Sequence, residues 1–565
     1  MLPIINRINR NSFTPKLFTV LKNGYHLPDL RADLIAGLTV AVVALPLAMA
    51  LAIASGASPD KGLVTAVIAG FLVSLLGGSR VQIGGPTGAF VVVVFTVIAQ
   101  HGYDGLIMAT LMVGLILIVS GYAKLGQIIK FIPYPVITGF TAGIAVIIAT
   151  SQIKDFLGLR PETVPADFIP KWMAYFEAIG TINPAALLLG LGALAAILLL
   201  RRFAPRLPAY LLVIVASALL ATLLHLPIET IGSRFPDMPS GLPAPHLPDF
   251  SFTKFQEVLP SAFIIAFLAG IEALLSAVVA DGMTGFKHRP NQELVGQGVA
   301  NIMSAIFGGL PATGAIARTA TNIKSGGRTP MAGIFHALFL LLFILFATDL
   351  MTFVPMAALA AILFIVAWGM SEKERFLHIF RMPGSDRAVL LLTFFLTILV
   401  DLTVAIGVGV TLASLLFMAR MSKTVKISTQ ANEAFDLDSE EKEENQRVNL
   451  PSGVEVFQIA GPFFFGVADE LLETLKRIGQ MPRVLIIRMR LVPYLDATGE
   501  AALENLVKQC REAGTSVIFS AVQTQPAAMM EKAGFGAAHL PVFYAASYKD
   551  SIAMAQDLLT ASHIM

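Results

Sequence analysis

Two charged residues lie inside long apolar stretches, where they could bind an ion or a proton. Apolar residues precede Glu272 for more than two helical turns, and Arg318 follows Gly308-Gly309-Leu310-Pro311-Ala312-Thr313-Gly314 by about one turn. A charge at mid-depth in a bilayer costs at least ~2.5–3.5 kcal/mol on insertion scales, so each side chain should face protein or water. A carboxyl group in a low dielectric readily holds a proton, and a planar guanidinium matches the oxygens of carboxylate, bicarbonate or sulfate. Glu272 is therefore a candidate proton carrier, and Arg318 a candidate anion-binding residue.

Other roles are open for both residues. Glu272 and Arg318 could form a fixed salt bridge, or Arg318 could reach the nearby membrane surface. Ser276 lies four residues after Glu272 on the same helical face and could share its site. Oxygen ligands of this kind would also suit Na⁺.

Arg318 belongs to the second of two Gly- and Pro-rich interruptions of the apolar sequence. The first is Gly77-Gly78-Ser79-Arg80-Val81-Gln82-Ile83-Gly84-Gly85-Pro86-Thr87-Gly88. Irregular backbone cannot face lipid, because each unpaired group there costs several kcal/mol. Interrupted segments at corresponding places in two halves of a chain point to a transporter's binding site.

Helices that begin at the two breaks, near Pro86 and Ala312, would aim their positive ends and free N–H groups at one ligand. Pro86 suits a first helical position, where its missing N–H costs nothing. The alternative is that Gly and Pro only kink two long helices. We predict an anion site formed by Pro86, Thr87, Gly88, Thr313, Gly314, Ala315 and Arg318.

The composition is that of a polytopic membrane protein. The chain has 565 residues, of which 55% are hydrophobic and 14% charged, with a mean hydropathy of +0.74. Soluble proteins carry about 25% charged residues. About fourteen apolar segments follow one another, at 34–55, 62–76, 86–100, 105–121, 134–152, 185–200, 209–226, 258–282, 292–307, 312–323, 331–348, 354–369, 388–400 and 402–419. Seven segments per half would make the second half an inverted repeat of the first.

Charge placement predicts the orientation. Lys and Arg gather in alternate loops, which the positive-inside rule places in the cytoplasm together with both termini. Residues 1–30 are expected to be a basic cytoplasmic arm and residues 31–420 the membrane region. A group of polar residues from Asp281 to Glu293 is interpreted as a solvated cytoplasmic face or a docking surface.

A soluble domain follows the membrane region. Residues 421–451 are polar and are predicted to be a linker, and 452–565 a small α/β domain. Strands are expected at 454–459, 484–487 and 516–519, with helices near 468–479, 498–513, 525–534 and 547–559. Alternating strands and helices favour a mostly parallel sheet. Thr498 follows a strand, where it could cap a helix, contact an anion or be phosphorylated.

No enzyme chemistry is indicated. The membrane region lacks metal-ligand spacing, a nucleotide-binding glycine pattern and a nucleophile constellation, so we expect neither an enzyme, a metal site, a cofactor nor a nucleic-acid partner. The one cysteine, Cys510, excludes an intramolecular disulfide.

Several motifs resemble those of the sulfate permease (SulP) family. They are Ala44-Leu45-Pro46-Leu47-Ala48-Met49-Ala50, Gly84-Gly85-Pro86-Thr87-Gly88, Gln152-Ile153-Lys154-Asp155-Phe156-Leu157-Gly158, Asp281-Gly282-Met283-Thr284-Gly285, Asn291-Gln292-Glu293-Leu294-Val295-Gly296-Gln297-Gly298 and Ser325-Gly326-Gly327-Arg328-Thr329. The C-terminal domain resembles a STAS domain, and Val366-Ala367-Trp368-Gly369-Met370-Ser371-Glu372 is similar to bacterial C4-dicarboxylate carriers of the family.

The resemblance implies a seven-plus-seven repeat with core and gate domains, and a homodimer. It adds the first span, from Ala44 to Leu51, to the substrate site and makes Glu272 the cation-coupling position. Glutamate there is similar to proton-coupled members, whereas sodium-dependent bicarbonate carriers have aspartate. Thr498 matches the phosphorylatable position of related STAS proteins, where Ser is more usual; a cytoplasmic regulator could act there.

These observations predict a transporter of the bacterial inner membrane. It would take up a small anion (C4-dicarboxylate, sulfate or bicarbonate) together with a proton. The alternatives are a Na⁺-coupled bicarbonate symporter and, from other classes, an anion channel or a membrane-tethered signalling protein.

Overall fold

The computed structural model divides the chain into two compact units, Met1–Ala413 and Ser414–Met565. It describes residues 13–127, 133–165, 167–205, 207–236, 239, 241–248, 251–382, 384–400, 402–429, 450–464 and 481–561. The expected helix near 468–479 and most of the expected linker lie outside these residues.

Each of the fourteen predicted apolar segments corresponds to a helix or to part of one. By length and composition alone, nine helices among the described residues could cross a membrane. The helices that correspond to the predicted segments are α3 (Leu27–Ala54), α4 (Pro59–Leu76), η1 (Gly88–Phe90) continuing as α5 (Val91–Tyr122), α6 (Tyr134–Leu157), α8 (Pro184–Phe203), α9 (Ala209–Leu223), α11 (Phe252–Thr284), α12 (Pro290–Ile306), α13 (Ile316–Lys324), α14 (Met331–Met351), α15 (Met356–Met370), α17 (Gly384–Leu399) and α18 (Leu402–Thr424).

Short helices connect or flank these segments. They are α2 (Lys16–Lys22), η2 (Leu125–Gln127), α7 (Phe168–Glu177), η4 (Ala178–Thr181), α10 (Ile231–Arg234) and α16 (Lys373–Phe380). The predicted separation of 86–100 from 105–121 is a kink inside α5, where Gly102 has φ 71° and ψ −176°. A residue without Cβ adopts this backbone conformation at no steric cost.

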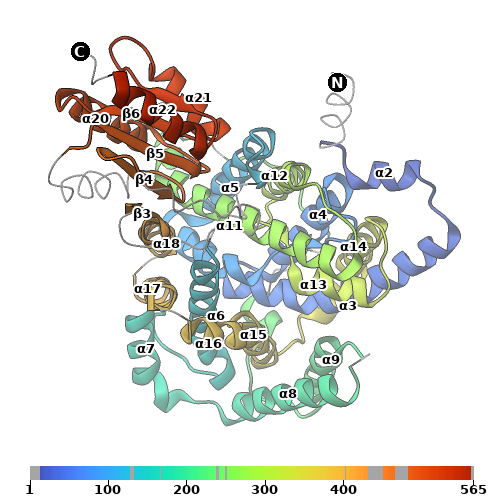
Figure 1. Cartoon of the computed structure of the whole chain (residues 1–565). Helices are drawn as coiled ribbons and strands as arrows, with labels where there is room; N and C mark the ends of the chain where they lie inside the picture. The colour runs from blue at the N-terminus through green and yellow to red at the C-terminus, as the bar shows by residue number, and fades with distance from the viewer. Residues whose placement is uncertain are drawn as a thin grey trace. The chain divides into compact units, whose positions relative to one another are not determined.

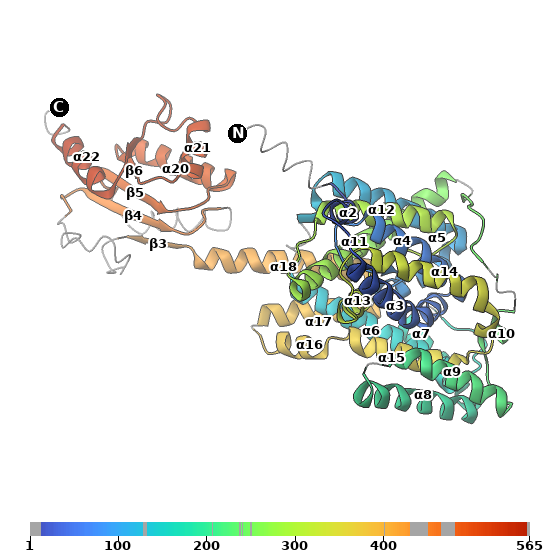
Figure 2. The ribbon, with the colours of Figure 1, turned by 90° about the vertical axis from the view of Figure 1, so that its right-hand side faces the viewer.

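The packing of the helices follows the inverted repeat. Helix α3 packs against α14, and its counterpart α11 packs against α5. In the same way α4 packs against α14, and its counterpart α12 packs against α5. Figures 1 and 2 show the blue helices α3 and α4 lying among α11 to α14 of the second half.

The two breaks meet at the centre of this arrangement. Strand β1 (Gly84–Gly85) pairs with β2 (Thr313–Gly314) in antiparallel register, with Gly84 opposite Gly314 and Gly85 opposite Thr313. Each break thus satisfies part of the other's backbone, as irregular chain inside a membrane protein requires.

The helices after the breaks begin later than the sequence predicted. Helix η1 begins at Gly88, so Pro86 is not its first residue, and α13 begins at Ile316 instead of near Ala312. The reason is the strand pairing: Thr313 and Gly314 lie in β2, where their backbone faces β1.

The second unit contains a five-stranded sheet in the order β3-β4-β5-β6-β7. The strands are β3 (Lys426–Thr429), β4 (Val454–Ala460), β5 (Val484–Leu491), β6 (Ser516–Ser520) and β7 (Phe543–Ala545), and β3 alone is antiparallel to its neighbour. The helices are α20 (Ala497–Glu512), α21 (Thr524–Lys532) and α22 (Tyr548–Ala561).

Both faces of this sheet are apolar, as expected for buried parallel strands. Phe457, Ile487 and Phe519 pack with residues of α20 and α21, while Val456 and Ile486 of the opposite face pack with α22. The mostly parallel sheet was predicted, but β3 and β7 were not. Strand β3 lies within the segment that was expected to be linker.

Candidate functional site

Side chains of α4 and α12 satisfy the backbone of the second break. The Leu310 N–H donates to Thr65 Oγ1 at 2.6 Å, and Ser304 Oγ donates to the Leu310 carbonyl at 2.7 Å. Asn301 binds both backbone groups of Ala312, each at 2.9 Å. The break is therefore fixed by buried hydrogen bonds, which keeps the start of α13 in place.

A buried carboxylate holds the first break. Glu293 is fully buried at the start of α12, where its Oε2 accepts the N–H groups of Gly78 at 2.7 Å and Ser79 at 3.0 Å. Gln297 Nε2 donates to Oε1 of the same carboxylate at 2.8 Å. The sequence predicts that Glu293 belongs to a solvated cytoplasmic face or a docking surface, and its complete burial shows that this prediction is wrong. Buried backbone N–H groups require an acceptor, and Glu293 supplies it.

Helix α13 ties both breaks to α11. Thr319 Oγ1 accepts the Ile83 N–H at 3.1 Å and also accepts a hydrogen bond from Ser276 at 3.2 Å. One turn later, Asn322 Nδ2 donates to the Val81 carbonyl at 2.8 Å. Ser276, proposed from the sequence as a partner of Glu272, thus has its hydroxyl directed to Thr319.

Arg318 lies in the first turn of α13 and is 3% exposed. Its Nη2 donates to the Pro86 carbonyl, and its guanidinium lies over Gly85, where an added Cβ would sit 2.5 Å from Nη1. Gly85 also has a φ of +145°, which side chains rarely adopt. Among the described residues, Arg318 Nε and Nη1 have no hydrogen-bond partner. The guanidinium therefore keeps free donors at the junction of the two breaks.

Glu272 reaches the first break from α11. Thr87 Oγ1 donates to Glu272 Oε2 at 2.7 Å, so this hydroxyl does not cap the helix that begins after it. One turn before Glu272, the Ala269 carbonyl accepts Thr313 Oγ1 at 2.8 Å. Among the described residues, Glu272 and Arg318 form no ion pair with each other.

The remaining predicted residues are apolar or lack a side chain. Ala44 and Leu51 are buried in α3, a helix that packs against α13, and could contribute shape but no hydrogen bond. Gly88 and Gly314 allow close approach, since an added Cβ would lie 2.5 Å from Met370 Sδ and 1.6 Å from Gln82 Nε2, respectively. Ala315 precedes α13, and its N–H donates to the Ile83 carbonyl at 2.8 Å.

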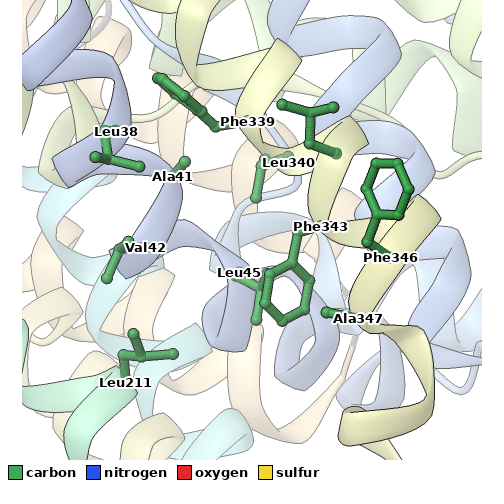
Figure 3. Close-up of a pocket in the computed structure, with 11 residues that line it drawn as sticks. Leu38, Ala41, Val42, Leu45, Leu211, Phe339, Leu340, Phe343, Phe346 and Ala347 are labelled. Carbon is green, nitrogen blue, oxygen red and sulfur yellow. The ribbon is translucent and has the colours of Figure 1, made fainter.

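A cavity of about 330 Å³ lies elsewhere in the membrane unit and is apolar. Figure 3 shows side chains of α3 and α14, with Leu211 of α9, surrounding it. None of its lining residues offers a polar side-chain atom, so it cannot replace the hydration of an anion.

Sequence reasoning missed three buried polar residues beside the site. They are Thr319, Gln82 and His336. His336 carried a readable signal, because ionisable residues, histidine included, are rare inside apolar runs such as 331–348 and usually face protein or water. The local sequence gave no signal for Thr319 or Gln82, because their role depends on contacts between segments that are distant in the chain.

In the second unit, Asp496 caps α20 by accepting the Gly499 N–H at 2.7 Å. Thr498 was considered as the cap, and this interpretation is wrong. It is exposed in the first turn of the helix instead. Cys510 is buried in the same helix, and burial raises the pKa of its thiol to about 11.

The two breaks cross where β1 pairs with β2. This crossing brings together a buried guanidinium with free donors, a carboxyl group and two threonines. A cation with unpaired N–H groups can bind an oxyanion, and a carboxyl group close by can change its charge by taking up a proton.

Comparisons with known proteins give a family match for both the membrane region and the C-terminal domain. The model of the Sulfate permease family matches residues 30–393, and that of the STAS domain matches 445–545. The Putative sulfate transporter YvdB of Bacillus subtilis is 42% identical over 513 residues, covering 90% of this chain and 95% of the relative. The Bicarbonate transporter BicA of Synechocystis is 36% identical over 537 residues, covering 91% and 92%.

A solved structure supports the same assignment. The transmembrane domain of a cyanobacterial bicarbonate transporter BicA matches with a TM-score of 0.60 and 34% identity, over 69% of this chain and 98% of that structure. The chain belongs to the sulfate permease family of membrane transporters and carries a C-terminal STAS domain.

Proposed function

We propose that this protein is a secondary transporter that takes up a small anion together with a proton. The observation that supports this most is Arg318, a buried cation with two unpartnered nitrogens where the two breaks cross. The Thr87–Glu272 pair lies at the same junction. Movement of a core domain against a gate would expose this site to each side of the membrane in turn.

Charge balance provides the coupling. With Glu272 ionised, its negative charge offsets that of Arg318. When Glu272 takes up a proton, Arg318 becomes the uncompensated charge and attracts an anion. At an effective dielectric of ~20, two neighbouring unit charges interact by roughly 2–4 kcal/mol, which corresponds to a change of about 30-fold to 900-fold in affinity. Protonation alone could therefore switch the site between weak and useful anion binding.

The substrate class is an oxyanion. A guanidinium with free N–H groups suits the paired oxygens of carboxylate, bicarbonate or sulfate alike. The relatives reported above carry the names Putative sulfate transporter and Bicarbonate transporter, whereas the motif at Val366–Glu372 resembles C4-dicarboxylate carriers. The three anions therefore form the test panel.

We also propose the surroundings of this transporter. It resides in a bacterial inner membrane as a homodimer, with both termini in the cytoplasm. No cofactor takes part beyond the coupling ion. Thr498, exposed at the start of α20, is available to a cytoplasmic regulator or a kinase.

The decisive experiment uses purified protein in sealed vesicles. Radiolabelled fumarate, sulfate and bicarbonate are offered under an imposed proton gradient, then under a Na⁺ gradient. We expect saturable uptake of at least one anion, driven by the proton gradient alone. Uptake driven only by Na⁺ would favour the sodium-coupled alternative. A conductance without saturation would identify a channel, and no flux of any anion would favour a signalling protein.

A further inference from the structure

A file of buried polar groups, made of Arg318, His336, Ser74 and Asp33, lies beside α14. Helix α14 carries His336 and Gly333 on one face, and Thr329 precedes the helix. Helix α4 contributes Ser74, and α3 contributes Asp33 near its beginning. With the proposed orientation, the file leads from the crossing of the breaks towards the cytoplasmic ends of α3 and α14.

His336 is the central member of the file. Its side chain is 0% exposed, and neither ring nitrogen has a hydrogen-bond partner among the described residues. A neutral imidazole carries one donor and one acceptor, so both are left open. The ring lies beside Gly70 of α4, where an added Cβ would be 4.0 Å from Nε2 and 3.2 Å from the Gly84 carbonyl of β1. His336 therefore lies next to the crossing itself.

The next two residues of the file, Ser74 and Asp33, differ in whether their side chains have hydrogen-bond partners. Ser74 Oγ has no partner in the described structure, and it occupies the space that a Cβ on Gly333 would need, at 1.9 Å. Asp33, in contrast, accepts the N–H groups of Arg328 at 2.7 Å and Thr329 at 3.1 Å, together with the Thr329 hydroxyl. Tyr25 also donates to it, at 3.2 Å. Asp33 is thus an anchor, while Ser74 and His336 remain open.

Open donors and acceptors at full burial are places where ordered water can bind and complete a hydrogen-bonded path. Buried polar groups in folded proteins are normally paired, and unpaired ones concentrate where water or chemistry completes them. In membrane transporters, buried histidine and acidic side chains in series form proton relays. The side chain of Gln82, also unpartnered at both amide atoms, adds a donor and an acceptor beside the crossing.

We propose that His336 carries the coupled proton between Glu272 and the cytoplasmic end of α14. This inference rests on the proposed proton-coupled function. After the anion leaves, the Glu272 carboxyl O–H gives its proton through water to an imidazole nitrogen, leaving a carboxylate and an imidazolium. The imidazolium then passes a proton to water beside Ser74 and returns to neutral imidazole.

The elements packed around His336 offer no free negative charge among the described residues. Helix α3 presents Gly37 to the backbone of α14 at His336, and α4 presents Gly70 and Ser74. Asp33, the nearest carboxylate on α3, is engaged by Arg328 and Thr329. An imidazolium at His336 would therefore have no carboxylate to form a lasting ion pair with, so it can serve only as a transient carrier of the proton.

The test measures proton and anion movement together. Vesicles containing wild-type protein, His336→Gln or His378→Gln receive labelled anion, while an enclosed dye reports the internal pH. His378 is an exposed residue of α16 and serves as the matched control. We expect His336→Gln to lower proton-driven accumulation at least tenfold, while anion exchange at equal pH stays within about twofold. His378→Gln should behave as wild type.

The outcomes separate this inference from the proposed function. Proton-coupled uptake by wild type that persists unchanged in His336→Gln overturns the relay alone. Equal loss of exchange and accumulation would show a structural role and also overturns it. Anion uptake by wild type without proton movement overturns both proposals. If His336→Gln does not fold, Ser74→Ala takes its place, with at least threefold slower proton-driven uptake expected and an unchanged rate contradicting the relay.

Discussion

The two breaks share a fold but differ in what they bring to their junction. The first contributes backbone and one hydroxyl: Arg318 binds the Pro86 carbonyl, and Thr87 binds Glu272. The second contributes the cation, because Arg318 lies in the first turn of α13. At the first break, the corresponding turn contains Gly88, Ala89 and Phe90, none of which can carry charge.

The breaks also differ in how their backbone is held. The first depends on residues of the second half, with Glu293 binding Gly78 and Ser79. The second is held by Thr65 of the first half and by Asn301 and Ser304 of its own. The inverted repeat therefore gives the two breaks similar backbone positions, whereas the side chains around them differ.

Removing the cation of the second break should have the largest effect. Arg318→Ala deletes the free donors and leaves the Pro86 carbonyl unpaired in a buried site. We expect anion affinity to fall at least 100-fold, about 2.7 kcal/mol, measured by substrate-dependent thermal shift and by uptake kinetics. Arg328→Ala is the control, since that side chain is 62% exposed and should change affinity by less than twofold. Intact affinity in Arg318→Ala would make the arginine structural.

Neutralising the carboxyl group at the first break should uncouple transport without abolishing binding. Glu272→Gln keeps a hydrogen-bonding partner for Thr87 but cannot exchange a proton. We expect gradient-driven accumulation to fall at least tenfold, while exchange of anion for anion persists. Thr87→Val, which removes the hydroxyl, should reduce uptake about threefold. Accumulation by Glu272→Gln at the wild-type level would exclude its coupling role.

The sequence predicted the frame better than the contacts. Long apolar runs and Gly-Pro interruptions identified the spans, the two breaks and the isolated charges, because lipid imposes strong rules on backbone and charge. The starts of η1 and α13 were misplaced, since β1 pairs with β2 across more than 200 residues. The buried role of Glu293 was missed for the same reason: its partners, Gly78 and Ser79, are distant in sequence. Non-local contacts leave no local pattern to read.

Adding a methyl group at Gly314 of the second break should destabilise the place where the two breaks cross. A Cβ at Gly314 would lie 1.6 Å from Gln82 Nε2, a buried side chain with little room to move. We expect Gly314→Ala to reduce stability by about 1–3 kcal/mol, as for other overpacked sites, seen as a lower unfolding temperature in detergent. Gly369→Ala is the control, because nothing lies within 4 Å of its added Cβ. Equal unfolding temperatures for the two variants would show that Gln82 can move aside.

The start of α20 has a side-chain cap, which the helix starts at the two breaks lack. Helices η1 and α13 begin without a side-chain cap, whereas Asp496 caps α20 in the STAS domain. Asp496→Ala should lower the free energy of unfolding of this domain by about 1 kcal/mol, measured by denaturant titration. Thr498→Ala, exposed two residues later, should change it by less than about 0.5 kcal/mol. The reverse order would make Thr498, and not Asp496, the residue that stabilises the start of α20.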